Sequence, residues 1–191
     1  MKKHFKNLLL TLIGCQIFMH QSIASENYPE VEIVTTSGSF TIELDRNRAP
    51  LSVENFLSYV EDGFYTNTIF HRVIEGFVIQ TGGYTTEFET KETKPEIVNE
   101  SGNGLSNRRM TLGMARSNEP HTASSQFYIN LIDNLSLDPM PTRWGYTVFG
   151  EVISGFEIVD AIGQSATQTF QGLQDVPIAP IIILETKKLD L

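Results

Sequence analysis

The sequence predicts a mainly β domain, a closed eight-stranded antiparallel β-barrel capped by two α-helices. Three observations support this fold class. Short β-rich runs recur along the chain, Gly-rich turns separate them, and two segments space their apolar residues as helices do. With 191 residues, 40% of them hydrophobic, the chain is long enough for one compact domain and too short for two ordinary ones.

The domain is predicted to open with a hairpin and a helix. Val31–Val34 and Phe40–Leu44 are β-rich, and the turn residues 36–39 between them favour two antiparallel strands. Apolar residues then recur at helical spacing, which predicts a helix over residues 52–62 with Ser52 as its N-cap.

The β pattern returns in short pieces after this helix. The further predicted strands are Ile69–Val73, Phe77–Gln80, Met110–Met114, Gln126–Asn130, Tyr146–Val152 and Ile178–Lys187. A second helix is predicted over Gly155–Ile162, with Phe156 on its inward face. The polar stretch Thr85–Arg109 is predicted to be a long surface loop. A flexible linker between two subdomains is the alternative, but neither half has enough strands to close a sheet.

Residues 1–24 are predicted to be a secretory signal peptide that precedes a domain over residues 28–190. Three lysines stand before the mostly apolar run Leu8–Met19, which is shorter than the roughly 20 residues of a membrane-spanning helix. Small residues up to Ala24 suit cleavage before Ser25. Two alternatives remain, a buried N-terminal helix and lipidation of Cys15, which ends a lipobox-like segment.

Charge and motifs exclude several function classes. Because the first 24 residues hold three lysines and no acidic residue, their removal would change the formal net charge from −9 to −12. Such an acidic domain is not expected to bind nucleic acid through a basic field. No serine-hydrolase, paired-histidine zinc or phosphate-loop motif stands out, so no metal and no cofactor are expected.

One segment concentrates apolar and amide side chains around an arginine. Phe70–Gly83 reads FHRVIEGFVIQTGG, with strand alternation on both sides of a short Glu75-Gly76 turn. The alternation places Arg72 on one face of the first strand and Gln80 on one face of the second. The short turn brings the two strands together, so these two side chains can approach one another on the same sheet surface.

This segment resembles the signature of the cyclophilin family of peptidyl-prolyl isomerases. Further blocks that are similar to the family follow in the same order. They are Asn99-Glu100, Met114–Arg116, Ser124–Ile129, Leu137-Asp138 and Val148–Val152. The resemblance covers residues 28–190, and several ordered blocks are far more specific than one short motif.

The resemblance implies a barrel with two helices and a surface groove for Pro-containing polypeptide substrates. Arg72 corresponds to the catalytic arginine. The residues that correspond to substrate-binding positions are Phe77, Val78, Gln80, Ala115, Arg116, Ser117, Gln126, Tyr128, Leu137 and Tyr146. Among them Phe77 would form the floor of a proline pocket and Gln80 would hold the substrate backbone.

The resemblance further implies a cofactor-independent rotamase that assists the folding of exported proteins. Tyr146 matches the bacterial exported subgroup, which together with the signal peptide predicts a periplasmic protein, or an envelope lipoprotein if Cys15 carries the anchor. A monomer without a membrane span is expected. The alternative function is a non-catalytic chaperone or binding module that holds Pro-containing segments in the same groove.

One departure from the family pattern concerns inhibition. Ser136 stands where many eukaryotic members carry a tryptophan beside the pocket, so weak cyclosporin sensitivity is expected. The only tryptophan, Trp144, lies eight residues later and is predicted to belong to a loop.

Overall fold

The computed structural model describes residues 26–190, so the predicted signal peptide and Cys15 lie outside the described part of the chain. The elements follow one another as β1 (Glu30–Thr35), β2 (Gly38–Leu44), α2 (Pro50–Glu61), β3 (Arg72–Ile74), β4 (Val78–Thr81), β5 (Thr111–Met114), β6 (Phe127–Asn130), the 3₁₀-helix η1 (Leu135–Leu137), β7 (Val148–Ser154), α3 (Phe156–Gly163), β8 (Thr167–Phe170), β9 (Leu173–Pro177) and β10 (Ile183–Lys188). The mainly β class with two α-helices is confirmed within this range.

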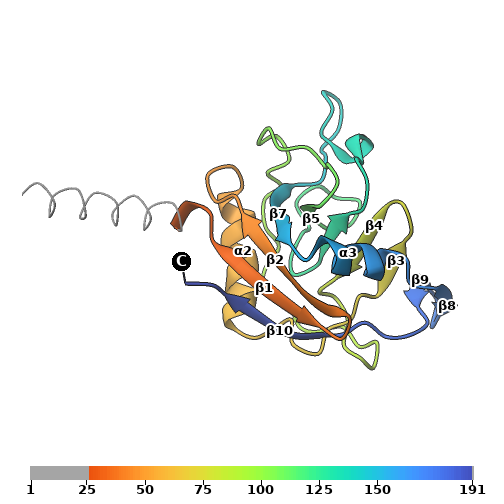
Figure 1. Ribbon diagram of the computed structural model, residues 1–191. Helices are drawn as coiled ribbons and strands as arrows, with labels where there is room; N and C mark the ends of the chain where they lie inside the picture. The colour runs from red at the N-terminus through yellow and green to blue at the C-terminus, as the bar shows by residue number, and fades with distance from the viewer. Residues whose placement is uncertain (1–25, 191) are drawn as a thin grey trace, which may run out of the picture.

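Eight strands form one antiparallel sheet in the order β10-β1-β2-β7-β5-β6-β4-β3. In Figure 1 the strands nearest the two chain ends, β1 and β10, lie side by side. The prediction of a closed barrel is wrong, because the sheet is an open half-barrel. Its edge strands β3 and β10 do not pair with one another. Residues 67–70, which precede β3, are joined to residues 181–183 by an isolated bridge between Ile69 and Ile182 and by a hydrogen bond from the Asn67 N–H to the Ile183 carbonyl at 2.8 Å.

The first hairpin forms as the sequence predicts. Residues of β1 are alternately half-buried and buried, and Thr35 pairs with Gly38 across a two-residue turn. Gly38 has φ +124°, a conformation that residues with a Cβ rarely adopt. The inward residues of β1 and β2, which include Val31, Ile33 and Ile42, are fully buried and form one side of the core.

Helix α2 begins two residues earlier than predicted, and Ser52 is not its N-cap. The cap position belongs to Ala49, which has no side-chain oxygen, and Pro50 occupies the first turn. A carboxylate from a distant loop replaces the missing cap. Glu100 accepts hydrogen bonds from the backbone N–H groups of Leu51 (3.0 Å) and Ser52 (2.8 Å). The Ser52 hydroxyl also donates to this carboxylate, at 2.7 Å.

The two helices cover the core from different sides. The Phe56 ring of α2 lies 5.2–5.5 Å from the rings of Tyr65, Phe127 and Phe149, centroid to centroid. Helix α3 buries Val159 and Ile162 and contacts β2, β3 and β4. Phe156, predicted to face inward, is instead 43% exposed.

Two strands were not predicted from the sequence. β8 and β9 form a separate hairpin after α3, and all four residues of β8 are exposed, so no inward-facing apolar pattern marks it. The predicted last strand, Ile178–Lys187, begins later than expected, at Ile183. The stretch Thr85–Arg109 is a long loop as predicted, held in place by hydrogen bonds that Asn99 and Asn107 donate and that the Glu100 carboxylate accepts.

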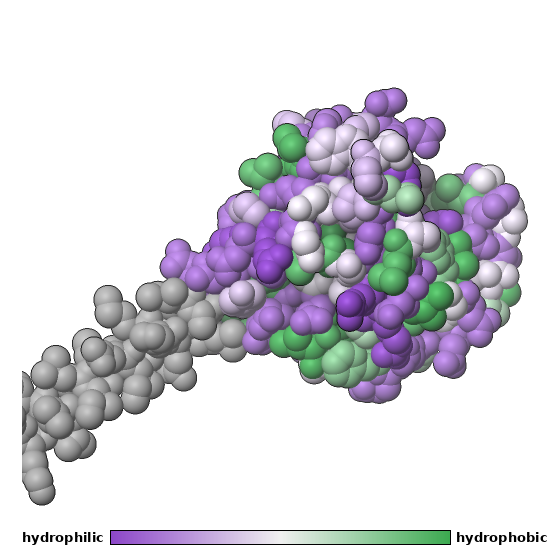
Figure 2. Space-filling model, turned by 90° about the horizontal axis from the view of Figure 1, so that it is seen from above, coloured by the Kyte–Doolittle hydropathy of each residue, from purple (hydrophilic) through white to green (hydrophobic). Residues whose placement is uncertain are grey.

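The surface is largely polar, with apolar residues in separate groups, as the face in Figure 2 shows. Among residues 26–190, no helix is both long enough and apolar enough to cross a membrane.

Candidate functional site

Nine of the predicted site residues line one cavity of about 230 Å³ on the sheet. They are Arg72, Phe77, Val78, Gln80, Ala115, Arg116, Tyr128, Leu137 and Tyr146. These residues come from β3, β4, β6 and η1, from the β3–β4 turn that carries Phe77, and from the segments that follow β5 and precede β7. The structure therefore brings together residues that lie as far as 74 positions apart, as the resemblance implies.

Arg72 and two glutamines form a row along the edge of this cavity. Arg72 pairs with Gln80 in the β3–β4 register, and its Nη1 donates to Gln80 Oε1 at 3.4 Å. Gln80 Nε2 in turn donates to Gln126 Oε1 at 2.9 Å. Gln126 does not line the cavity, but it holds the amide of Gln80, which does.

The floor and walls of the cavity are apolar or aromatic. Val78 and Tyr128 are 2% and 4% exposed, and Phe77 and Leu137 are half-buried. Burial raises the pKa of the Tyr128 hydroxyl well above its usual value, so this group stays protonated and acts as a donor. A concave apolar site with a few polar groups at its edge suits a ring such as that of proline.

A buried polar network lies behind the aromatic wall, and sequence reasoning missed it. Tyr128 donates its hydroxyl hydrogen to Asn107 Oδ1 at 2.6 Å. Asn107 is fully buried and donates through Nδ2 to Asp138 Oδ1 at 2.9 Å. Asn130 Nδ2 also donates to Asn107 Oδ1, and Asn134 Nδ2 donates to the Phe77 carbonyl at 2.9 Å. The network thus connects Tyr128 and Phe77, two residues of the cavity wall, to the loop that carries Asn107.

Arg116 and Ser117 differ in their places. The Arg116 guanidinium lies 4.4 Å above the Tyr146 ring centre and donates to the backbone oxygens of Trp144 and Gly145. The side chain thus packs on the protein and forms part of the cavity wall. Ser117 does not line the cavity, because its exposed hydroxyl bonds to Thr122 Oγ1 at 2.7 Å in the neighbouring loop.

The β8–β9 hairpin places an acidic residue near Arg72. Asp175 Oδ2 lies 4.0 Å from Arg72 Nε, and both side chains are 40% exposed. Such an exposed, long ion pair is worth little in stability. It nevertheless gives the guanidinium a second partner besides Gln80. No sequence signal pointed to Asp175, since the hairpin that carries it was not predicted.

His71 lies on the opposite strand face from Arg72, as predicted. It is 5% exposed and packs against Tyr84, with ring centres 4.8 Å apart. Burial lowers the pKa of His71 from 6.5 to about 4, and the positive charge of Arg72 acts in the same direction. The ring is therefore neutral at pH 7 and belongs to the packing beneath the site.

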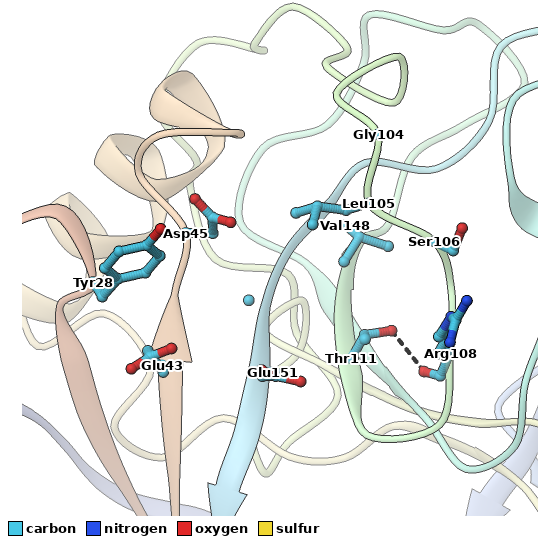
Figure 3. A pocket seen from close by; sticks show the side chains of 11 residues that line it. Tyr28, Glu43, Asp45, Gly104, Leu105, Ser106, Arg108, Thr111, Val148 and Glu151 are labelled. Carbon is cyan, nitrogen blue, oxygen red and sulfur yellow. Dashed lines mark hydrogen bonds between the residues drawn. The ribbon is translucent and has the colours of Figure 1, made fainter.

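A second cavity of about 400 Å³ lies elsewhere on the sheet and contains none of the predicted site residues. In Figure 3, Glu43 and Asp45 lie on one side of it, Glu151 in the middle and Arg108 on the other side. Burial and then the neighbouring carboxylates raise the pKa of Glu43. Over residues 26–190 no three His, Cys, Asp or Glu side chains are grouped as metal ligands would be.

Comparisons with known proteins point to one family. The model of the cyclophilin type peptidyl-prolyl cis-trans isomerase family matches residues 30–188. Peptidyl-prolyl cis-trans isomerase A of Dickeya dadantii is 41% identical over 187 residues, which cover 98% of each chain. Peptidyl-prolyl cis-trans isomerase B of Escherichia coli is 47% identical over 152 residues, 78% of this chain and 93% of the relative.

A solved structure gives the same comparison in three dimensions. The crystal structure of a cyclophilin type peptidyl-prolyl cis-trans isomerase of Cryptosporidium parvum has a TM-score of 0.72 and 28% identity, with 86% of this chain and 99% of that chain covered. A second structure of that protein, in the presence of the dipeptide Ala-Pro, has a TM-score of 0.71 and 29% identity, with 85% and 99% covered.

Proposed function

Because the chain belongs to the cyclophilin-type peptidyl-prolyl cis-trans isomerase family and is a cofactor-independent isomerase, we propose that Arg72 is its catalytic residue and that exported proteins are its substrates. Cyclophilins bind proline-containing peptides. The observation that carries the assignment of Arg72 is its place at the edge of the apolar cavity, where it donates to Gln80 and its side chain is 40% exposed.

The chemistry of the peptide bond explains why an arginine suits this place. Rotation about the C–N bond is opposed by about 18–20 kcal/mol, because resonance between the carbonyl group and the nitrogen is lost. As the bond twists, the nitrogen regains a lone pair and can accept a hydrogen bond. A donor at this nitrogen stabilises the twisted state more than the planar ground state and so lowers the barrier. The guanidinium of Arg72 is always charged and offers several N–H donors.

One hydrogen bond is not sufficient for a large rate increase. A ten-thousandfold acceleration requires about 5.4 kcal/mol, at roughly 1.36 kcal/mol per factor of ten. A charge-assisted hydrogen bond supplies about 1.5–3 kcal/mol of this. The remainder is assigned to the cavity, which holds the proline ring against Phe77 and Tyr128 while the residue before proline turns. The side-chain amide of Gln80 would hold the backbone of the client polypeptide. Its Oε1 already accepts from Arg72 and its Nε2 already donates to Gln126, so the client would use the hydrogen-bonding capacity that remains on this amide.

The proposed substrates are exported or envelope proteins whose folding is limited by slow X-Pro bonds, which take tens of seconds or more to isomerise unaided. The support is the N-terminal sequence, in which three lysines and a short apolar run precede small residues before Ser25. On this proposal the mature protein resides in the periplasm. The mass of the purified mature chain tests it. A chain that begins at Ser25 supports export as a free protein, a lipid-bearing Cys15 supports an envelope lipoprotein, and an uncleaved chain contradicts export.

A refolding experiment tests the proposed role in folding. The full chain is added to a test protein whose refolding is limited by one X-Pro bond. The Arg72→Ala variant is added to a parallel sample. The wild type should shorten the slow phase and the variant should have little effect at the same concentration. If the two proteins accelerate the slow refolding phase equally, Arg72 is not the catalytic residue.

A further inference from the structure

The loop between η1 and β7 forms a hollow outside the proline cavity. This hollow has a volume of about 410 Å³ and is lined by Ser101, Gly102 and residues 139–144. Its rim carries two large apolar side chains, Met140 (56% exposed) and Trp144 (49% exposed). Large apolar side chains that gather around a hollow on a polar surface are typical of binding sites rather than of ordinary surface.

Backbone hydrogen bonds and prolines restrain the loop, so the chain itself sets the walls of the hollow. The backbones of Met140 and Arg143 exchange two hydrogen bonds of 3.0 and 3.1 Å around a tight turn, and prolines occupy positions 139 and 141. The Trp144 ring packs edge-on against His121 at 5.1 Å. A hollow whose walls are already ordered loses little conformational entropy on binding.

The same loop is continuous with the proline cavity. Leu137 and Tyr146, which line that cavity, stand at the two ends of the loop, and the Tyr146 N–H donates to the Leu137 carbonyl at 2.9 Å. Arg116, also in the cavity wall, donates to the Trp144 carbonyl at 3.2 Å. An extended peptide advances about 3.3 Å per residue, so a residue roughly three to five positions from a bound proline can reach across this short loop.

We propose that the hollow is a second client subsite, which takes one large apolar side chain, such as leucine, of the same polypeptide whose proline occupies the cavity. The inference rests on the proposed function, because the client must first lie in the proline cavity. The subsite selects X-Pro bonds that have an apolar residue a few positions away. Such bonds are exposed in unfolded clients and buried after folding, which suits an enzyme that acts during folding.

The test uses a series of Ser/Gly-rich peptides with one central Ala-Pro and a single leucine, moved stepwise over six positions on either side. Trp144 is the only tryptophan of the chain, so its fluorescence reports occupancy of the hollow directly. Catalysed cis/trans exchange is measured on the same samples by NMR exchange spectroscopy. One leucine position, three to five residues from proline, should lower the dissociation constant about tenfold, as the burial of a leucine side chain predicts, and should shift the Trp144 emission.

The variant that disrupts the hollow is Met140→Ser, which keeps the reporter tryptophan and changes an exposed side chain. It should abolish the gain from leucine and leave the exchange rate of the leucine-free peptide within about twofold. The proposal is overturned if no leucine position binds more tightly, or if Met140→Ser retains the gain. Arg72→Ala separates the two proposals. If Arg72→Ala loses catalysed exchange but still binds the leucine peptide more tightly, both proposals are supported. If exchange does not depend on Arg72, only the catalytic assignment is contradicted.

Discussion

At the scale of single residues, the site consists of side chains whose positions are fixed by polar neighbours. Arg72 donates to Gln80 through Nη1 and lies 4.0 Å from the carboxylate of Asp175 through Nε, and its side chain is still 40% exposed. Tyr128 presents its ring to the cavity and its hydroxyl to Asn107. Rigid placement matters here, because a catalytic donor works only when it is aimed at the twisted nitrogen before the bond turns.

The hydrogen bond between Tyr128 and Asn107 should contribute both to stability and to client binding. Asn107→Ala leaves the buried Tyr128 hydroxyl and the Asn130 amide without their common acceptor, which should cost about 1–3 kcal/mol of unfolding free energy. Denaturant titration of Asn107→Ala, Tyr128→Phe and the double variant measures the coupling. We expect a coupling of about 1 kcal/mol, and additive effects would show that the bond contributes nothing.

His71 should make the protein sensitive to mild acid. Its pKa is 6.5 in the unfolded chain and about 4 in the native state, so between these values only the unfolded chain takes up the proton. The contribution of His71 to the unfolding free energy is fully present above pH 6.5 and is lost as the pH falls to about 4. The total is about 3 kcal/mol, at roughly 1.36 kcal/mol per pH unit. His71→Gln should flatten the fall in unfolding free energy over this range, and an unchanged slope would contradict the assignment.

At the scale of elements, the sequence predicts what depends on local pattern. The strands around Arg72 and the helix with Phe56 follow from alternation and from helical spacing, and the β3–β4 turn brings Arg72 opposite Gln80 as expected. The ordered family motifs name eleven site residues, and in the structure nine of them line one cavity. What the sequence does not show are partners from distant segments, such as Asn107 behind Tyr128 and Asp175 beside Arg72.

The cap of α2 is a clear case of such a distant partner. Glu100 is 48 residues from Ser52 along the chain, and no local pattern relates the two. Glu100→Ala removes the acceptor of two backbone N–H groups at the start of the helix, so we expect a loss of about 1–3 kcal/mol in unfolding free energy. Glu100→Gln, which keeps one acceptor oxygen, should lose less. Denaturant titration gives both values, and equal losses would mean that the hydrogen bonds are not what matters.

At the scale of the whole molecule, an open sheet still provides a rigid base for the site. Strands β3 and β4 lie at one edge of the half-barrel with β6 paired beside β4, and the 3₁₀-helix η1 and the segments after β5 and before β7 supply the rest of the cavity lining. The core beneath them is a continuous set of buried apolar residues that joins both helices to the sheet. The prediction of full closure failed because the edge strands β3 and β10 do not pair, and only the short segments 67–70 and 181–183 are hydrogen-bonded, a distant contact that local sequence patterns do not reveal.

The central claim is that Arg72 stabilises the twisted peptide bond rather than the bound substrate. The most direct test measures both the catalysed cis/trans exchange and the peptide dissociation constant for Arg72→Ala and Arg72→Lys. Loss of one charge-assisted hydrogen bond predicts a fall in kcat/KM of about 10- to 150-fold for the alanine variant. The peptide dissociation constant should change less than about threefold, since the bond forms only in the transition state. The lysine variant should recover only part of the activity, because an ammonium cannot keep the fork geometry. A variant that binds peptide far more weakly but exchanges bound peptide at the wild-type rate would contradict the claim.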